Sequence, residues 1–139
     1  SMEPTLPTKC YFFGLRLPYL IGDPLPVRGD VIMLRSDEYD ELMVKRVIGL
    51  PGETVSFENG SVYIDGALLE EPYLTEKALG ECDITLPYQV PDNRYFCVGD
   101  HRSTSVDSRS TAVGCISDEQ IVGRIVFRVW PLPDFGALK

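Results

Sequence analysis

The stretch Thr54-Val55-Ser56-Phe57-Glu58-Asn59-Gly60-Ser61-Val62-Tyr63-Ile64 decides the fold class. Apolar and polar residues alternate on both sides of Asn59-Gly60, which is the pattern of half-buried strands. Asn and Gly accept the positive φ angles that a two-residue hairpin turn requires. The stretch therefore predicts two antiparallel strands, Thr54–Phe57 and Ser61–Ile64, joined by a tight turn.

The rest of the chain continues this β pattern. Further runs rich in β-branched and aromatic residues predict strands at Val31–Leu34, Met43–Ile48, Tyr95–Val98 and Ile125–Val129. Twelve glycines and eleven prolines interrupt the 139 residues and leave little room for long helices. A short helix is predicted at Ser117–Gly123, with Ser117 as its N-cap and Gly123 as its stop. We expect a mostly β, antiparallel fold with at most one or two short helices.

The length of the chain suits one domain with a substantial core and a small subdomain. Residues 57–93 contain the hairpin turn and then a polar segment that carries proline. We therefore expect residues 1–56 and 94–139 to form the β core, and residues 57–93 to form a small inserted β cap.

Composition argues against several classes of protein. A net charge of −8 disfavours nucleic acid as a partner, because a phosphate backbone attracts a basic surface. No apolar run reaches the roughly 20 residues that span a bilayer. Four cysteines without a CxxC pair and a single histidine predict neither a metal site nor a cofactor. We interpret the cysteines as small buried side chains, with a Cys82–Cys97 bridge as the alternative outside the cytosol.

Lys45 is the candidate general base. It lies in the apolar run Met43–Ile48, where strict alternation places Lys45 on one face of the strand and Arg46 on the other. A lysine in such a run either keeps its ammonium in water at a sheet edge or is desolvated, with a lowered pKa. A desolvated, neutral lysine can take the proton of a serine hydroxyl and so activate it as a nucleophile.

Ser1 is the candidate nucleophile for that base. Pro4 restricts its own φ angle and biases Glu3 toward an extended conformation, which stiffens the segment after the hydroxyl. A Ser-Met start is also what the removal of a purification tag leaves. The assignment of Ser1 as the nucleophile therefore depends on the other segments of the chain that would act with it.

The polar loop Gly99–Arg109 supplies candidate partners for Lys45. A hydroxyl at Ser105 could orient the lysine amine, as the third member of a catalytic triad orients its base. Asp107 and Arg109 are close enough in sequence to form an ion pair that holds the loop. Asp100 could pair with Arg46 or with Arg102.

Two other interpretations of the function each rest on one short feature of the sequence. A Ser1/His101/Asp107 arrangement would be a conventional triad, but His101 lies in a turn-like segment with no motif around it. Arg28-Gly29-Asp30 is the cell-adhesion tripeptide, which would suggest an extracellular binding module. Because it leads directly into the strand Val31–Leu34, we interpret it as turn chemistry.

Taken in order, four segments resemble the sequence boxes of bacterial type I signal peptidases, which are serine–lysine proteases that remove signal peptides from exported proteins. The segments are Ser1–Leu6, Arg28–Ile32, Lys45–Glu53 and Gly99–Arg109. The resemblance covers nearly the whole chain except about residues 57–93. Four boxes in order with compatible spacing make it specific.

The resemblance implies a role for each candidate residue. Ser1 would be the acylating nucleophile, Lys45 the general base, and Ser105 the hydroxyl that aims the lysine amine. The supporting ion pairs would be Asp107 with Arg109 and Asp100 with Arg46. Shallow pockets for small side chains around an Ala-x-Ala cleavage site would be lined by Met2, Met43 and Val44. The partners would be preproteins that carry signal peptides, with the substrate extended beside the Lys45 strand.

The resemblance also implies a location and two departures. Members of this family act at the cell membrane, with the catalytic domain on the extracytoplasmic face and a membrane anchor before the nucleophile. Loss of their upstream oxyanion hydroxyl would cost this chain on the order of 100- to 1,000-fold in turnover, so we expect the isolated chain to be a poor enzyme. His101 stands where the family usually has asparagine.

The Tyr11-Phe12-Phe13 cluster and Trp130 fit either a rim on the bilayer surface or the core.

Two alternative functions remain open from the sequence. Another serine–lysine peptidase, such as a self-cleaving repressor or a pilus-maturation peptidase, would share the Ser1 and Lys45 chemistry. A non-catalytic binding module would keep the fold and lose one of the two residues.

Overall fold

A computed structural model describes residues 2–5, 11–15, 25–38, 40–130 and 136–137. In the described residues the strand pairs are all antiparallel, which confirms the mostly β fold class. The elements, in chain order, are β1 (Tyr11–Leu15), β2 (Val31–Arg35), β3 (Leu42–Gly49), β4 (Thr54–Glu58), β5 (Ser61–Ile64), β6 (Ala67–Leu68), β7 (Tyr88–Gln89), β8 (Arg94–Val98), β9 (Ile116–Ser117), the 3-10 helix η2 (Asp118–Gln120), β10 (Ile121–Trp130) and β11 (Gly136–Ala137).

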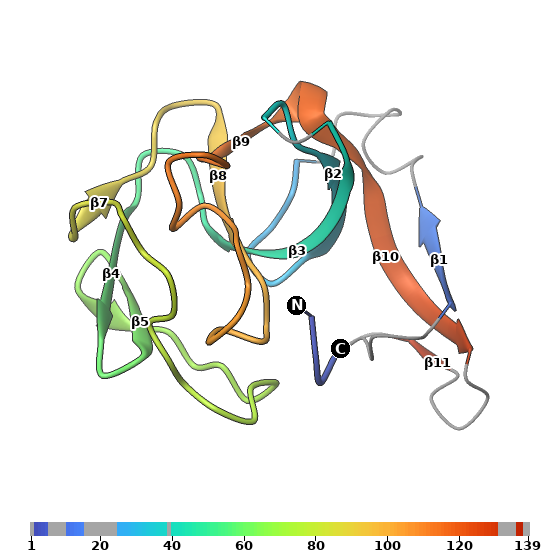
Figure 1. Ribbon diagram of the computed structural model, residues 1–139, viewed down its shortest axis with the longest axis horizontal. Coiled ribbons are helices and arrows are strands. Elements are labelled where there is room, and N and C mark those ends of the chain that lie inside the picture. The colour runs from blue at the N-terminus through green and yellow to red at the C-terminus, as the bar shows by residue number, and fades with distance from the viewer. Residues whose placement is uncertain (1, 6–10, 16–24, 39, 131–135, 138–139) are drawn as a thin grey trace.

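The larger sheet is curved and contains seven strands (Figure 1). Its strand order is β1-β10-β2-β3-β8-β9, and β11 also pairs with β10. Strand β3, which carries the candidate base, lies between β2 and β8 and therefore inside the sheet. The aromatic run Tyr11-Phe12-Phe13, for which no strand is predicted above, lies in β1 and pairs with β10.

The predicted helix at Ser117–Gly123 is wrong in its extent. Only Asp118–Gln120 forms a 3-10 turn; the backbone N–H of Ser117 donates to the Gln120 side chain (3.0 Å). Strand β10 begins at Ile121, and Gly123 lies inside it opposite Met33 at a register shift. Pairing with β2 overrides the helical pattern, because β-branched Ile121 and Val122 suit a strand once a partner is available.

The smaller sheet has the order β6-β5-β4-β7. The predicted hairpin is confirmed: β4 pairs with β5, and the turn residues Asn59 and Gly60 have φ angles of 51° and 81°. The division into a core and an inserted cap at 57–93 stays a prediction. The sheet itself begins at Thr54 and ends with Gln89.

Three clusters of buried apolar residues hold the two sheets. The cluster between the small sheet and strands β3 and β8 contains Ile48, Val55, Phe57, Val62, Ile64, Val90, Phe96, Val98 and Cys115. A second cluster contains Ile32, Leu34, Val47, Tyr95, Cys97 and Ile116. A third contains Met2, Val31 and Ile125. Because the first cluster mixes both sheets, the small sheet depends on β3 and β8 for its burial.

Cys82, Cys97 and Cys115 are free thiols, so the structure has no Cys82–Cys97 bridge. Cys97 and Cys115 are buried, as expected for small apolar side chains. The expectation is wrong for Cys82, which is half-buried, and Cys10 lies outside the described residues. Among the described residues, none of the helices has the length and apolar character needed to cross a membrane.

Candidate functional site

Lys45 lies on β3 directly opposite Ile32 of β2. Lys45 is 3% exposed, and its Nζ donates a hydrogen bond to Ser105 Oγ at 2.9 Å. Burial lowers the pKa of Lys45; the charge of Asp107 opposes that shift and the charge of Arg109 adds to it. The amine is therefore held in the setting that a general base needs, because desolvation favours its neutral form.

Ser105 connects this amine to the loop 99–109. It is 1% exposed, and its backbone N–H donates to the His101 carbonyl at 3.0 Å. The Ser105 hydroxyl accepts from Lys45, and its interaction with Asp107 helps to lower the pKa of that carboxyl. A serine hydroxyl has one proton and two lone pairs, so it can serve both partners at once.

Asp107 and Arg109 form a buried ion pair that shapes the loop. Arg109 donates to both carboxylate oxygens of Asp107, from Nε at 2.8 Å and from Nη2 at 2.7 Å. The backbone N–H of Gly99 adds a third bond at 2.9 Å. Burial alone would raise the pKa of Asp107, but the Arg109 bonds and charge hold it below its ordinary value. Asp107 therefore remains an anion near Lys45.

Arg46 pairs with Asp100 on the opposite side of β3. Its Nε and Nη2 donate to the two Asp100 oxygens at 2.9 Å and 2.7 Å, and its Nη1 donates to the Gly29 carbonyl at 2.9 Å. Of the two partners that the sequence offered to Asp100, the structure selects Arg46. Arg102 pairs with Glu71 instead.

The N-terminal segment reaches this site at both of its described ends. Met2 is buried with Val31 and Ile125, and Val44 packs against that cluster. Thr5 Oγ1 donates to Asp100 and accepts from Arg46 Nη2 at 3.3 Å. Ser1, the candidate nucleophile, lies outside the described residues.

The three residues assigned to substrate pockets do not share one face. Val44 packs against the cluster of Met2, whereas Met43 packs against the cluster of Ile32, Leu34 and Val47. The alternation of β3 explains this separation, because successive side chains point to opposite faces.

The contacts do not support the His101 triad or the adhesion tripeptide. His101 Nδ1 lies 2.7 Å from Thr104 Oγ1 within its own loop, while Asp107 is occupied by Arg109 and Gly99. Arg28 forms an ion pair with Glu53 (2.5 Å), and the Gly29 N–H donates to the Val47 carbonyl, so the tripeptide is a turn tied to β3.

Several residues in this network escaped the sequence analysis. They are Thr5, Glu71, Tyr73 and Ser108. Nothing in the sequence separates buried Glu71 from its exposed neighbour Glu70. Ser108 fixes the loop to β8 through its hydroxyl, which accepts from the Cys97 N–H at 3.0 Å. A buried polar residue in a polar segment does not change the hydrophobic periodicity of the sequence. These residues can therefore be recognised only from their tertiary contacts.

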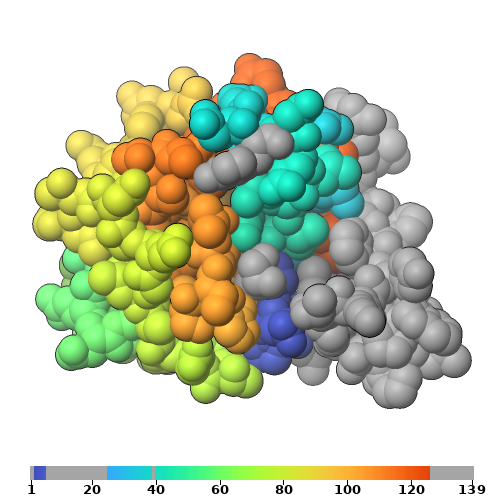
Figure 2. All heavy atoms as spheres, in the orientation of Figure 1, coloured from blue at the N-terminus to red at the C-terminus, as the bar shows by residue number. Residues whose placement is uncertain are grey.

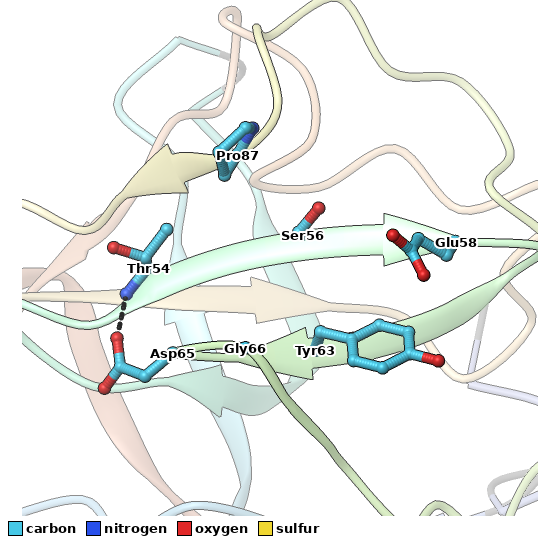
Figure 3. A pocket seen from close by; sticks show the side chains of 7 residues that line it. All are labelled: Thr54, Ser56, Glu58, Tyr63, Asp65, Gly66 and Pro87. Carbon is cyan, nitrogen blue, oxygen red and sulfur yellow. Dashed lines mark hydrogen bonds between the residues drawn. The ribbon is translucent and has the colours of Figure 1, made fainter.

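A hollow of about 680 Å³ lies elsewhere, on the outer face of the small sheet (Figure 3). Its lining comes from β4, β5 and the adjoining turns: Thr54, Ser56, Glu58, Tyr63, Asp65, Gly66 and Pro87. The Asp65 carboxylate accepts from the Thr54 N–H at 2.8 Å. No residue of the Lys45–Ser105 network lines this hollow. In the part of the chain that the structure describes, no group of three or more His, Cys, Asp or Glu side chains could hold a metal ion.

Comparisons with known proteins identify the family of this chain. The family model "Signal peptidase, peptidase S26" matches residues 1–130. A probable signal peptidase I-2 from Synechocystis sp. is 34% identical over 99% of this chain, which spans 63% of that relative. Signal peptidase I S from Bacillus subtilis is 40% identical over 94% of the chain and 73% of the relative.

A solved structure of a signal peptidase I from Enterococcus faecalis is also similar. It is 32% identical, with a TM-score of 0.62 over 72% of this chain and 96% of that one. With residues 1–130 matched by the family model and relatives of this identity, the chain belongs to the bacterial type I signal peptidases of peptidase family S26.

Proposed function

We propose that the chain carries the catalytic machinery of a serine endopeptidase that removes signal peptides from exported preproteins after a small residue, at an Ala-x-Ala type of site. The observation that carries this proposal is the buried Lys45 amine, whose pKa is lowered and whose Nζ lies 2.9 Å from Ser105 Oγ. The names of the relatives support the same activity, since each is a signal peptidase I.

In the proposed reaction, neutral Lys45 takes the proton of the Ser1 hydroxyl as its oxygen attacks the scissile carbonyl. Protonated Lys45 then returns that proton to the leaving amine as the peptide bond breaks, which leaves an acyl-enzyme. Lys45 then takes a proton from a water molecule as its oxygen attacks the acyl carbon. The ester bond to Ser1 breaks, Ser1 Oγ takes the proton back from Lys45, and the signal peptide leaves with a new carboxylate. Ser105 keeps the amine aimed through both steps, and Asp107 stabilises the ammonium while it exists.

The placement of Met2 ties the N-terminal segment to β3. Met2 is buried with Val31 and Ile125, and Val44, the sequence neighbour of Lys45, packs against that cluster. The segment that follows the proposed nucleophile is therefore anchored at the strand that carries the proposed base.

The strand that carries Lys45 is where an extended substrate would lie. Residues Leu42 to Arg46 of β3 pair with β2, and β8 pairs with β3 from Arg46 onward. A peptide that lies extended beside this strand would gain affinity from backbone bonds, and its small side chains would contact Met2, Met43 and Val44. The partners would be preproteins and, at the extracytoplasmic face of the cell membrane, the bilayer surface.

Cleavage of a preprotein tests this proposal directly. The protein is incubated in phospholipid vesicles with a preprotein whose cleavage site is Ala-x-Ala, and the new N-terminus is determined by mass spectrometry. We expect a single cut after the second Ala and its loss when that Ala is replaced by a bulky residue. Cleavage by Ser1→Ala at the wild-type rate would refute the assignment of the nucleophile.

A further inference from the structure

Residues 71–80, which belong to the predicted insert, are bonded to the loop 99–109. Glu71 accepts two bonds from Arg102, at 3.1 Å and 2.5 Å. The Leu79 carbonyl accepts from Arg109 Nη1. Figure 2 shows the yellow-green atoms of this segment beside the orange atoms of the loop. The segment is thus joined to the same loop that carries Ser105.

Tyr73 stands between the two buried ion pairs of this region. The Arg46 guanidinium lies over the Tyr73 ring, with Cζ 3.7 Å from the ring centroid. On its other side, the Tyr73 hydroxyl donates to Glu71 Oε2 at 2.6 Å. Burial and the bond to Glu71 raise the pKa of this hydroxyl, so it remains a donor. Tyr73 therefore connects Glu71–Arg102 to Arg46–Asp100.

Four hydrogen bonds occupy the edge of the Arg46 guanidinium. Its nitrogens donate to Asp100, to the Gly29 carbonyl and to Thr5, which leaves the planar face for the aromatic ring. A guanidinium bonded at its edge and stacked on its face has little freedom to rotate. The position of Thr5 then follows from the position of Arg46 and Asp100.

We infer that Tyr73 is a positioning residue for the proposed peptidase site: its ring fixes the Arg46–Asp100 pair, and that pair fixes Thr5 and the segment that follows the proposed nucleophile. This role rests on the proposed function for its catalytic consequence, but the anchoring of residues 2–5 can be measured without catalysis. The inserted segment is then part of the site and not only a cover beside it.

Two variants separate the ring from the hydroxyl. Tyr73→Phe keeps the face under Arg46, and Tyr73→Met fills much of the space without a ring. Tyr63→Met is the matched control, because Tyr63 lies on the outer face of the small sheet. We expect kcat for preprotein cleavage to fall about tenfold in Tyr73→Met, with KM changed less than threefold, and to stay within about threefold of wild type in Tyr73→Phe and Tyr63→Met.

Hydrogen exchange supplies the readout that does not need activity. The amides of Met2, Glu3 and Thr5 should exchange at least about tenfold faster in Tyr73→Met than in Tyr63→Met, while the amides of β4 and β5 keep their protection. If Tyr73→Met does not fold, Tyr73→Leu takes its place as the variant without a ring, with the same faster exchange expected at Met2, Glu3 and Thr5. Unchanged exchange at these residues, or an equal kcat loss in Tyr73→Phe and Tyr73→Met, would overturn the inference.

The proposed function fails separately from this inference. If Ser1→Ala cleaves preprotein like wild type, the peptidase mechanism is wrong, and the exchange data still decide whether Tyr73 anchors residues 2–5. If cleavage depends on Ser1 but the exchange pattern is the same in Tyr73→Met and Tyr63→Met, the peptidase stands and the positioning role is wrong.

Discussion

The loop 99–109 and the outer face of the small sheet contain similar polar side chains in opposite surroundings. Around the loop, Ser105 and Asp107 are buried, and each is bonded to a charged or hydroxyl partner. On the outer face, Ser56 and Glu58 line an open hollow. The polar groups of the loop are therefore desolvated and partnered, whereas those of the hollow lie beside open space. For the proposed proton transfer at Lys45, desolvation and partners matter more than open volume.

The largest expected effect on cleavage comes from replacing Lys45, which is bonded to the loop 99–109. Lys45→Met removes the proposed base, so preprotein cleavage should fall by about 10,000-fold or more. The free energy of unfolding at pH 7 should stay level or rise, because a buried amine with a lowered pKa destabilises the folded state there. The control is Lys77→Met at an exposed position. Rate assays and urea unfolding check both; near-normal cleavage in Lys45→Met would remove Lys45 from the mechanism.

Asp107→Asn should show the largest loss of stability. Removing one partner of a buried ion pair leaves Arg109 uncompensated, at a cost of about 3–5 kcal/mol. Glu58→Gln on the hollow should change stability by less than about 0.5 kcal/mol. Urea titrations at pH 7 compare the two, and similar small values would show that burial does not separate the regions.

The same variant has a pH signature. The pKa of Asp107 is lowered by folding, so its contribution is present above the unfolded pKa and is lost as pH falls through the lower, folded pKa. The stability gap between wild type and Asp107→Asn should therefore be constant near neutral pH and shrink below about pH 4. Urea midpoints measured from pH 7 down to pH 3 check the trend.

Replacing a serine in the loop and a serine at the hollow should affect kcat differently. Ser105→Ala should lower kcat by about 100-fold, because the Lys45 amine loses the hydroxyl that aims it. Ser56→Ala, which removes a hydroxyl from the hollow, should leave kcat unchanged. Steady-state kinetics on one preprotein separates them, and a loss in Ser56→Ala would assign the hollow a part in the reaction.

The rate of the wild-type protein should rise with pH. Only neutral Lys45 can act as the base, so kcat/KM should increase by up to about tenfold per pH unit until the pH passes the pKa of Lys45. Because burial lowers that pKa, the plateau should come below the ordinary lysine value of about 10.4. A profile without an ascending limb would contradict the role of Lys45.

The smallest expected effect compares two glycines with positive φ. A Cβ at Gly80 (φ +67°) would lie 2.1 Å from the Arg102 carbonyl oxygen, whereas a Cβ at Gly66 (φ +85°) on the hollow would meet nothing within 4 Å. Both Ala variants carry about 1 kcal/mol of backbone strain, and only Gly80→Ala adds the clash. Thermal unfolding should place Gly80→Ala below Gly66→Ala; equal midpoints would show that residues 71–80 yield easily.

Much of the fold followed from local patterns. Alternation around Asn59-Gly60 predicted the hairpin, and the strands that carry Lys45 and Phe96 were located within one or two residues at each end. The start of β10 was missed, because the pairing of Ile121 with Leu34 depends on a strand almost ninety residues earlier in the chain. Period-two patterning reports which face is buried but not which distant strand supplies the partner.

Periodicity, turn chemistry and ordered sequence boxes are local features, and they sufficed to predict the antiparallel β class, the family and the candidate pair Ser1 and Lys45. The pairing of Asp100 with Arg46 and of Arg102 with Glu71 emerged from the folded chain alone. The tertiary structure also decided that Tyr73 lies under Arg46 and that Thr5 reaches Asp100. Each of these contacts joins residues from separate elements, and the charge of a side chain does not indicate which opposite charge the fold will bring to it.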